Sequence, residues 1–272
     1  MIFITCALHC EAKPIIERYK LAADREAFFP IFKNENLVLV VTGIGKLLTA
    51  SAMAYVYARY QEPEYSAWLN VGVAGVKNIE LGCLLNVNKV TEISTAINWY
   101  PVRLPALSTL PSCALITLDE AGNNYTENDA FDMEASAFMA MALRFSPVEL
   151  VQIVKVVSDN LQNDMQAVNK QQVTALIAIK LPEIEMVVDA LAAEAVTFRE
   201  NYQNDDLYKE CIDKWHFSAY QKKQLLRILP QWQALDGNAG FDQLTDFQSA
   251  KHVIAFVSIQ LRDRDIYFGE IS

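Results

Sequence analysis

The sequence predicts an α/β fold with a helix-covered, mainly parallel mixed sheet, followed by a C-terminal helical extension. Over the first two hundred residues, short apolar runs alternate with longer amphipathic stretches. The run Leu37–Thr42 is rich in β-branched residues and has no polar alternation, as expected of a strand buried on both faces. From Asn204 onward the pattern is helical. We therefore expect one domain over residues 1–203 and a helical extension of unknown role over residues 204–272.

Local signals mark the elements of the first domain. A strand is expected over Ile2–Leu8, and the next helix, Ala12–Lys20, carries Pro14 in its first turn, where a missing N–H costs little. Gly43 and Gly45 interrupt the apolar pattern after the second strand. The other strands are expected over Trp68–Val71, Cys83–Val90, Ala114–Leu118 and Leu150–Val157, and the other helices over Lys46–Tyr60, Phe131–Phe145 and Pro182–Tyr202.

The extension has helical signals of its own. Ser218 and Gln221 have the spacing of a capping box, which predicts a helix that starts there and ends at Leu229, before Pro230. Two further helices are expected, over Leu207–Trp215 and Asp242–Ile266.

Composition excludes several classes of function. The formal charge is −10 and the predicted pI is about 4.9, so the chain would repel a nucleic-acid backbone. Five scattered cysteines and three histidines show no zinc-ligand spacing, so no metal and no cofactor are expected, and reduced cysteines indicate the cytoplasm. The apolar N-terminal run has no basic start and is too short for a signal sequence or a membrane span, so no membrane partner is expected.

Glycines or polar residues follow four of the predicted strands. In mainly parallel sheets, active sites gather at the carboxyl ends of the strands. Gly43–Lys46 is not a P-loop, because Val40 stands where the first glycine is needed. It is not a complete dinucleotide-binding motif either, because Leu48 replaces the third glycine. Taken alone, this segment and Gly72–Gly75 are most simply tight turns, although small residues also let a backbone approach a ligand.

Acidic side chains lie at the same predicted edge. Glu11 and Asp132 are each explained by a position in a first helical turn, and Asp159 by a helix N-cap. Asp132 and Glu134 would be separated by about 200° on one helix, so we expect only one of them to point inward. Three such acids near one rim of the sheet are nevertheless harder to explain together than singly.

Five segments, in this order, resemble the purine nucleoside phosphorylase/uridine phosphorylase superfamily. They are most similar to its hydrolytic branch, the methylthioadenosine/S-adenosylhomocysteine nucleosidases. The resemblance covers roughly residues 1–200. The matching segments are Ala7–Glu11, Thr42–Lys46, Asn70–Gly75, Asp132–Ala135 and Val157–Asp159.

The resemblance implies a role for each matching side chain. Glu11 matches the acid that activates the attacking water, and Asp159 matches the general acid that protonates the departing purine. Glu134 matches the acid that hydrogen-bonds the ribose hydroxyls, and Met133 matches a residue packed against the ribose. The implied substrate-binding set is completed by Val73, Ala74 and Ser158.

The resemblance and the chemistry together imply a nucleosidase that hydrolyses a purine nucleoside, including 5′-modified ones. Such cleavage passes through an oxocarbenium-like state, which needs a base, an acid and nearby negative charge. A phosphorylase of the same fold and a non-catalytic nucleoside-binding protein are the alternatives. Hydrolysis is favoured because no arginine lies in the glycine segments, although Arg18 and Arg103 remain candidates for binding phosphate. The expected partner is a small-molecule nucleoside, and the resemblance implies a homodimer.

The sequence also departs from the family. The region between Gly75 and Met133 is shorter than in the family, and Lys155 stands where relatives often carry an arginine. The usual Gly-Asp-x-Phe segment is replaced by Leu118–Gly122, so Tyr125 or Phe131 is expected to supply the aromatic contact to the base.

Overall fold

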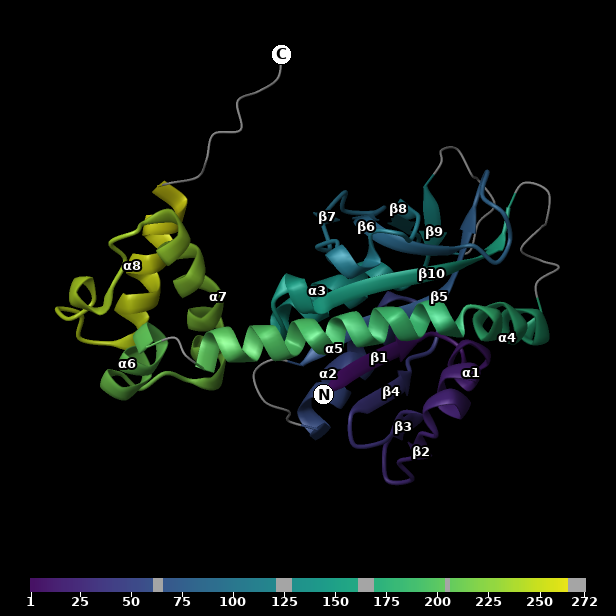
Figure 1. Cartoon of the computed structure of the whole chain (residues 1–272), viewed down its shortest axis with the longest axis horizontal. Helices are drawn as coiled ribbons and strands as arrows, with labels where there is room; N and C mark the ends of the chain where they lie inside the picture. Colours follow the sequence, from purple (N-terminus) through teal and green to yellow (C-terminus); the bar gives the residue numbers. More distant parts are fainter. Residues whose placement is uncertain (61–65, 121–128, 161–168, 204–205, 264–272) are drawn as a thin grey trace, which may run out of the picture. The chain divides into compact units, whose positions relative to one another are not determined.

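A computed structural model describes residues 1–60, 66–120, 129–160, 169–203 and 206–263 (Figure 1). The chain divides into two compact units, Met1–Val196 and Thr197–Ser272. The domain boundary expected after residue 203 stays a prediction.

One mixed sheet organises the first unit. Its central strands run parallel in the order β4, β1, β5 and β10, with β3 and β2 added at one side. At the other side β10 also pairs with β6, β6 with β8, β8 with β9, and β9 with β5, so these five strands close into a ring. The strands are β1 (Ile2–Cys6), β2 (Ala22–Ala23), β3 (Ile31–Lys33), β4 (Leu37–Val41), β5 (Ala67–Val76), β6 (Leu84–Glu92), β7 (Asn98–Trp99), β8 (Ser112–Thr117), β9 (Ala130–Asp132) and β10 (Val151–Asp159).

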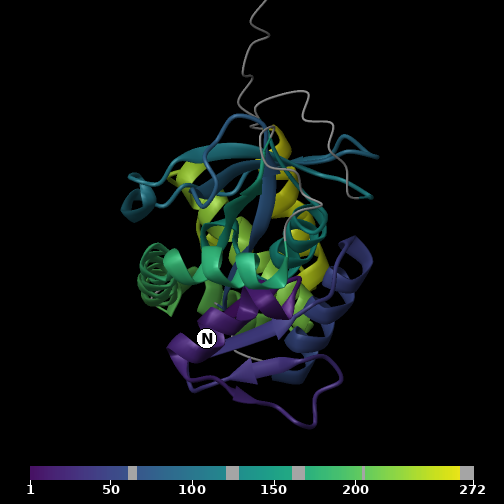
Figure 2. The same cartoon turned by 90° about the vertical axis from the view of Figure 1, so that its right-hand side faces the viewer.

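Helices cover this sheet in two pairs, α1 against α4 and α2 against α3, and all four contact strands (Figures 1 and 2). None of the described helices is long and apolar enough to cross a membrane. The helices are α1 (His9–Tyr19), α2 (Lys46–Tyr60), α3 (Ala135–Phe145), α4 (Lys170–Ile179), α5 (Leu181–Gln203), α6 (Asp206–Lys214), α7 (Ala219–Leu235) and α8 (Ala250–Asp263), with 3₁₀ turns at Pro105–Leu107, Val148–Leu150 and Phe241–Gln243.

The core explains why the apolar runs form central strands. Phe3 stacks on Trp68 with ring centroids 4.6 Å apart, and both side chains are buried. All nine residues of β10 are buried, including its polar members Gln152, Lys155, Ser158 and Asp159. Burial of polar groups in the strand that lies between β5 and β6 requires partners for them, and these partners form the candidate site. The cysteines form no disulfide bond within the described chain, and the cytoplasmic location expected from them stays a prediction.

The two glycine segments differ in conformation. Gly43 and Gly45 have φ of 85° and 98°, so the turn expected there is confirmed, and it needs glycine. The turn expected at Gly72–Gly75 is wrong, because β5 continues to Val76 and pairs with β10 through this segment. Gly72 is instead explained by the limited space around it.

Four expected helix boundaries are also wrong. Helix α1 begins at His9 rather than at Ala12, so Pro14 lies inside the helix and not in its first turn. The helix expected from Phe131 begins at Ala135, because Ala130–Asp132 pairs with β5 and β8 as β9. Helix α7 continues through Pro230 to Leu235, and the buried Leu229 and Trp232 on either side of the proline offset its local cost. Helix α8 starts only at Ala250, after the 3₁₀ turn at Phe241–Gln243.

Candidate active site

A cavity of about 290 Å³ lies at the carboxyl ends of the central parallel strands. All seven residues proposed from the sequence line it, and they come from four separate segments of the chain. These residues are Glu11, Val73, Ala74, Met133, Glu134, Ser158 and Asp159. The remaining lining residues are Ala7, Leu8, Cys10, Ile44, Gly75, Leu118, Phe131, Asp132, Asn169, Lys170 and Val173.

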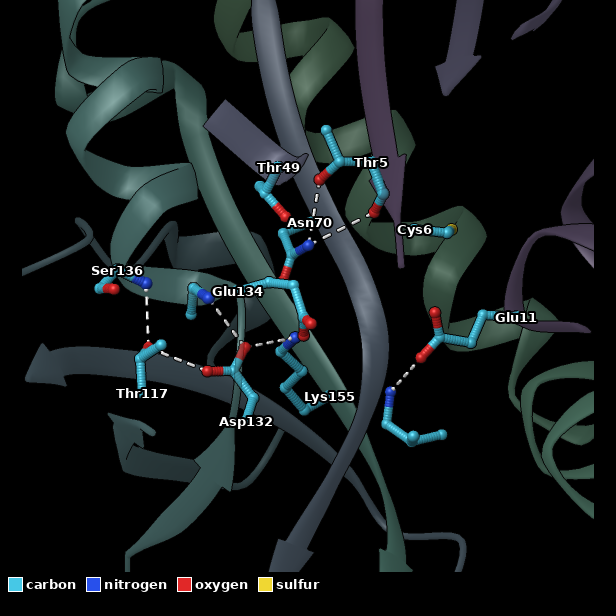
Figure 3. Close-up of polar contacts among 12 residues, drawn as sticks. Thr5, Cys6, Glu11, Thr49, Asn70, Thr117, Asp132, Glu134, Ser136 and Lys155 are labelled. Carbon is cyan, nitrogen blue, oxygen red and sulfur yellow. Dashed lines mark hydrogen bonds and ion pairs between the residues drawn. The ribbon is translucent and has the colours of Figure 1, made fainter. Parts of the chain in front are cut away.

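Glu11 is a buried acid in the first turn of α1, and backbone amides hold its carboxylate in place. Oε2 accepts a hydrogen bond from the Leu8 amide at 2.8 Å, and Oε1 accepts one from the Val73 amide at 3.0 Å. Figure 3 draws one of these two bonds at the Glu11 carboxylate. Burial raises the pKa of Glu11, while the Lys155 ammonium and these amides oppose the rise. A buried carboxylate with a raised pKa is a stronger base than an exposed glutamate.

Glu134 is the N-cap residue of α3, and its side chain is also buried. Its Oε1 accepts a hydrogen bond of 2.7 Å from the amide of Gly45, in the turn between β4 and α2. Burial and the neighbouring Asp132 raise the pKa of Glu134 to about 7, although Lys155 and the Gly45 amide oppose the rise. Near neutral pH this carboxyl group can therefore exist in either protonation state, and a positively charged ligand would favour the anion.

Asp132 and Lys155 form a buried ion pair beside these two glutamates. The Lys155 Nζ lies 2.8 Å from the Asp132 Oδ2, and the same Oδ2 accepts a hydrogen bond from the Ala135 amide at 2.9 Å. The Asp132 Oδ1 accepts a hydrogen bond from the Thr117 hydroxyl at 2.9 Å (Figure 3). Burial alone would lower the pKa of Lys155, but Asp132, Glu134 and Glu11 raise it above its ordinary value. One lysine thus provides positive charge for three buried carboxylates.

Gly72 marks the place where Glu11 and Lys155 approach the same point of β5. A Cβ atom added to Gly72 would lie 3.1 Å from the Glu11 Oε1 and 3.2 Å from the Lys155 Nζ. The glycine is therefore explained by space rather than by a turn. This contact also places the carboxylate and the ammonium group on one side of the strand.

Asp159 ends β10 and is buried at the edge of the cavity. The Ser158 hydroxyl donates a hydrogen bond to the Asp159 Oδ1. The N-cap explanation for Asp159 is wrong within the described chain, because α4 is capped by Asn169 instead. The Asp159 carboxyl group therefore lies where it can contact a ligand in the cavity.

The structure corrects a further expectation about the acids and adds residues that the sequence did not indicate. Asp132 and Glu134 both point inward, because Asp132 ends a strand and the helical angle between them does not apply. The sequence singles out Lys155 but does not predict its pairing with Asp132. A lysine inside a mainly apolar strand was the available signal. The bond from the Gly45 amide had no signal in the sequence.

The aromatic residues and arginines expected to contact a ligand have different outcomes. Phe131 lines the cavity, whereas Tyr125 lies outside the described residues. The two arginines considered for phosphate binding do not line the cavity. Arg18 pairs with Glu185, and Arg103 donates hydrogen bonds to the carbonyl oxygens of Ser108 and Leu110. Among the described residues, no three His, Cys, Asp or Glu side chains are arranged to hold a metal ion.

Comparison with solved structures identifies the fold. The 5′-methylthioadenosine/S-adenosylhomocysteine nucleosidase of Campylobacter jejuni is 19% identical with a TM-score of 0.57, covering 70% of this chain and 97% of that one. The corresponding nucleosidase of Colwellia psychrerythraea 34H, in complex with adenine, is 17% identical with a TM-score of 0.55, covering 70% and 94%. Futalosine hydrolase of Helicobacter pylori strain 26695 is 16% identical with a TM-score of 0.56, covering 69% and 97%.

These similarities show that the chain has the nucleoside phosphorylase-like α/β fold, and the fold predicted from the sequence is confirmed. No family model matches the chain, and no curated protein matches it by sequence. Nearly the whole of each of these three solved chains corresponds to about 70% of this one.

Proposed function

We propose that the chain is a nucleosidase that hydrolyses the N-glycosidic bond of a purine nucleoside, including 5′-modified ones such as methylthioadenosine or S-adenosylhomocysteine. One observation carries the proposal: three buried carboxyl groups, Glu11, Glu134 and Asp159, from separate segments line one cavity. Cleavage of this bond needs a base for water, an acid for the departing purine and negative charge near the sugar. The neighbours of the same fold include nucleosidases, which supports this assignment.

In this mechanism two carboxyl groups move protons at opposite ends of the breaking bond. Glu11 takes a proton from water as the water oxygen bonds to the anomeric carbon. The bond between that carbon and the purine nitrogen breaks, and Asp159 donates a proton to a ring nitrogen of the departing base. The amides of Leu8 and Val73 and the Lys155 ammonium fix the Glu11 carboxylate in the orientation that this step requires.

The remaining residues bind the substrate. Glu134 accepts hydrogen bonds from the ribose hydroxyls, and its negative charge stabilises the positive charge that develops on the sugar. Met133 packs against the ribose. Val73, Ala74 and Ser158 form the wall beside the base, where Val73 has no hydroxyl to donate.

The charge of the cavity favours water over phosphate as the nucleophile. Among the described lining residues there are four acids (Glu11, Asp132, Glu134 and Asp159) and one base, Lys170. Such a lining repels a phosphate anion, whereas neutral water enters freely. We therefore place hydrolysis ahead of phosphorolysis.

A homodimer is part of the proposal. Exposed apolar side chains gather at the start of α2, next to the cavity: Ile44 is 52%, Leu47 80% and Leu48 46% exposed. Ile44 also lines the cavity, so a second copy seated on these residues would cover its edge. Light scattering of the purified chain is expected to give twice the monomer mass of 30.6 kDa.

The direct test is release of free base from a panel of nucleosides, with and without phosphate. The panel contains methylthioadenosine, S-adenosylhomocysteine, 5′-deoxyadenosine, adenosine and inosine. We expect release without phosphate for at least one member. Release only with phosphate would establish a phosphorylase instead, and binding without release would establish a non-catalytic nucleoside-binding protein.

A further inference from the structure

A second cluster of charges lies beside the cavity and contains none of the proposed catalytic residues. The ammonium group of Lys46 contacts the carboxylates of both Glu92 and Asp119. Glu92 also accepts hydrogen bonds from the hydroxyls of Ser94 and Thr95. We call Lys46, Glu92 and Asp119 the Lys46 cluster. The Glu92 side chain is 13% exposed, so this ion pair is better shielded from solvent than a typical surface pair.

The Lys46 cluster joins three parts of the chain that are far apart in sequence. Lys46 is the first residue of α2, Glu92 is the last residue of β6, and Asp119 follows β8. In two of these segments, a residue one or two positions before the charged residue lines the cavity. Ile44 precedes Lys46 and Leu118 precedes Asp119, and both line the cavity. The cluster therefore connects two walls of the cavity from outside it.

The 43–45 turn next to Lys46 is held by different partners at its two ends. Its first residues are bonded to the end of β1, since the Thr42 and Gly43 amides donate to the carbonyl oxygens of Cys6 and Ala7 at 2.8 and 3.1 Å. At the other end of the turn, the Gly45 amide donates to the Glu134 carboxylate. The two positive-φ glycines give this segment backbone freedom, so an attachment near Gly45 limits its motion.

We propose that Lys46 is a positioning residue: by binding Glu92 and Asp119 together, it fixes the 43–45 turn against Leu118 and keeps the Gly45 amide on the Glu134 carboxylate. The kinetic effects expected from this inference rest on the proposed function. The effect of Lys46 on the order of the 43–45 turn does not depend on that function. Lys46 itself does not line the cavity. It acts on the ribose-binding acid only through the backbone of its neighbour.

The kinetic test replaces Lys46 with methionine, which keeps a long apolar side chain and removes the charge. We expect KM for the best nucleoside of the panel to rise about tenfold with kcat changed less than threefold, and Lys46→Arg to restore most of the loss. Lys180→Met is the matched control, because Lys180 has the same 25% side-chain exposure, pairs with Glu183 at 2.7 Å and does not line the cavity. If Lys46→Met and Lys180→Met have the same kinetics, the proposal is wrong.

The pH dependence supplies a readout that a merely structural ion pair would not change. The charged groups that act on Glu134 are Asp132, Lys155 and Glu11, and all three remain in Lys46→Met. Loss of the Gly45 hydrogen bond removes one interaction that lowers the pKa of Glu134, so the rising limb of kcat/KM against pH should move to higher pH. An unchanged limb would contradict the proposal.

Hydrogen exchange separates failure of this proposal from failure of the proposed function. In the ligand-free protein, amides of residues 43–48 should exchange at least tenfold faster in Lys46→Met than in wild type or Lys180→Met. This result requires no turnover of any nucleoside. If Lys46→Met does not fold, Asp119→Asn is the variant to measure, since it removes one of the two carboxylate partners. Unchanged exchange in a folded variant overturns the proposal.

Discussion

Replacement of Glu134 by glutamine tests the site by stability and by activity at once. Burial and Asp132 raise the pKa of Glu134 to about 7 from an ordinary value of 4.5. A pKa shift of this size lowers the free energy of unfolding of the ligand-free protein by about 3 kcal/mol above pH 7, where Glu134 is ionised. Because the folded pKa lies above the unfolded one, this contribution to stability is present below about pH 4.5 and is lost as pH rises through 7. Glutamine cannot ionise, so the variant avoids this loss.

The expected result is a variant that is more stable and less active. Relative to wild type, the free energy of unfolding of Glu134→Gln should increase from pH 5 to pH 8 by up to about 3 kcal/mol, as measured by urea unfolding at both values. Turnover should fall roughly 10²-fold or more, because the amide carries no negative charge for the transition state. In wild type, kcat/KM should rise with pH through about 7, and this limb should be absent from the variant.

Two outcomes would refute this reasoning. An equal stability difference at pH 5 and pH 8 would show that Glu134 does not titrate with a raised pKa in the folded protein. Unchanged kcat/KM in a folded variant would remove Glu134 from the mechanism. The Gly45 amide can still donate to the side-chain oxygen of glutamine, so a local collapse of the turn does not explain either outcome.

Three further variants test the surroundings of the carboxylates. Gly72→Ala places a methyl group 3.1 Å from the Glu11 Oε1, so kcat should fall at least tenfold while circular dichroism still shows a folded chain. Lys155→Met leaves Asp132 buried without its cation and should lower the unfolding free energy by about 3–5 kcal/mol. Adding Asp132→Asn to this variant should recover part of the loss. A decrease below about 1 kcal/mol in Lys155→Met would contradict the buried ion pair. Asp159→Asn should slow base release from a purine nucleoside by about 10²–10⁴-fold. For a nucleoside whose base leaves without protonation, the variant should slow release much less. Equal decreases in rate for the two substrates would exclude Asp159 as the acid.

Much of the fold could be predicted because the central strands carry strong local signals. Leu37–Val41 is continuously apolar, and Leu150–Val157 is apolar and valine-rich apart from Gln152 and Lys155, as expected of strands in a covered sheet. The short strands β2, β3, β7 and β9 were not predicted, because strands of two or three residues depend on their pairing partners rather than on their own sequence.

Most of the cavity could be predicted because parallel strands present their carboxyl ends at one edge of the sheet. That rule, with the resemblance, is enough to bring Glu11, Val73 and Asp159 together from the sequence alone. It could not predict which charged groups pair, since the Lys155–Asp132 contact depends on the register of β10, β5 and β9. The same rule could not distinguish a glycine that a turn requires from a glycine such as Gly72, where neighbouring side chains leave no room for a Cβ atom.

The most direct test of the account is the rate of free-base release in phosphate-free buffer by the unmodified chain and by Glu11→Gln. We predict measurable release from at least one purine nucleoside by the unmodified chain, and a loss of about 10²-fold or more in the variant, with binding of free purine retained in both. No release by the unmodified chain, or equal release by the two proteins, would contradict the claim that this carboxylate activates water in the cavity.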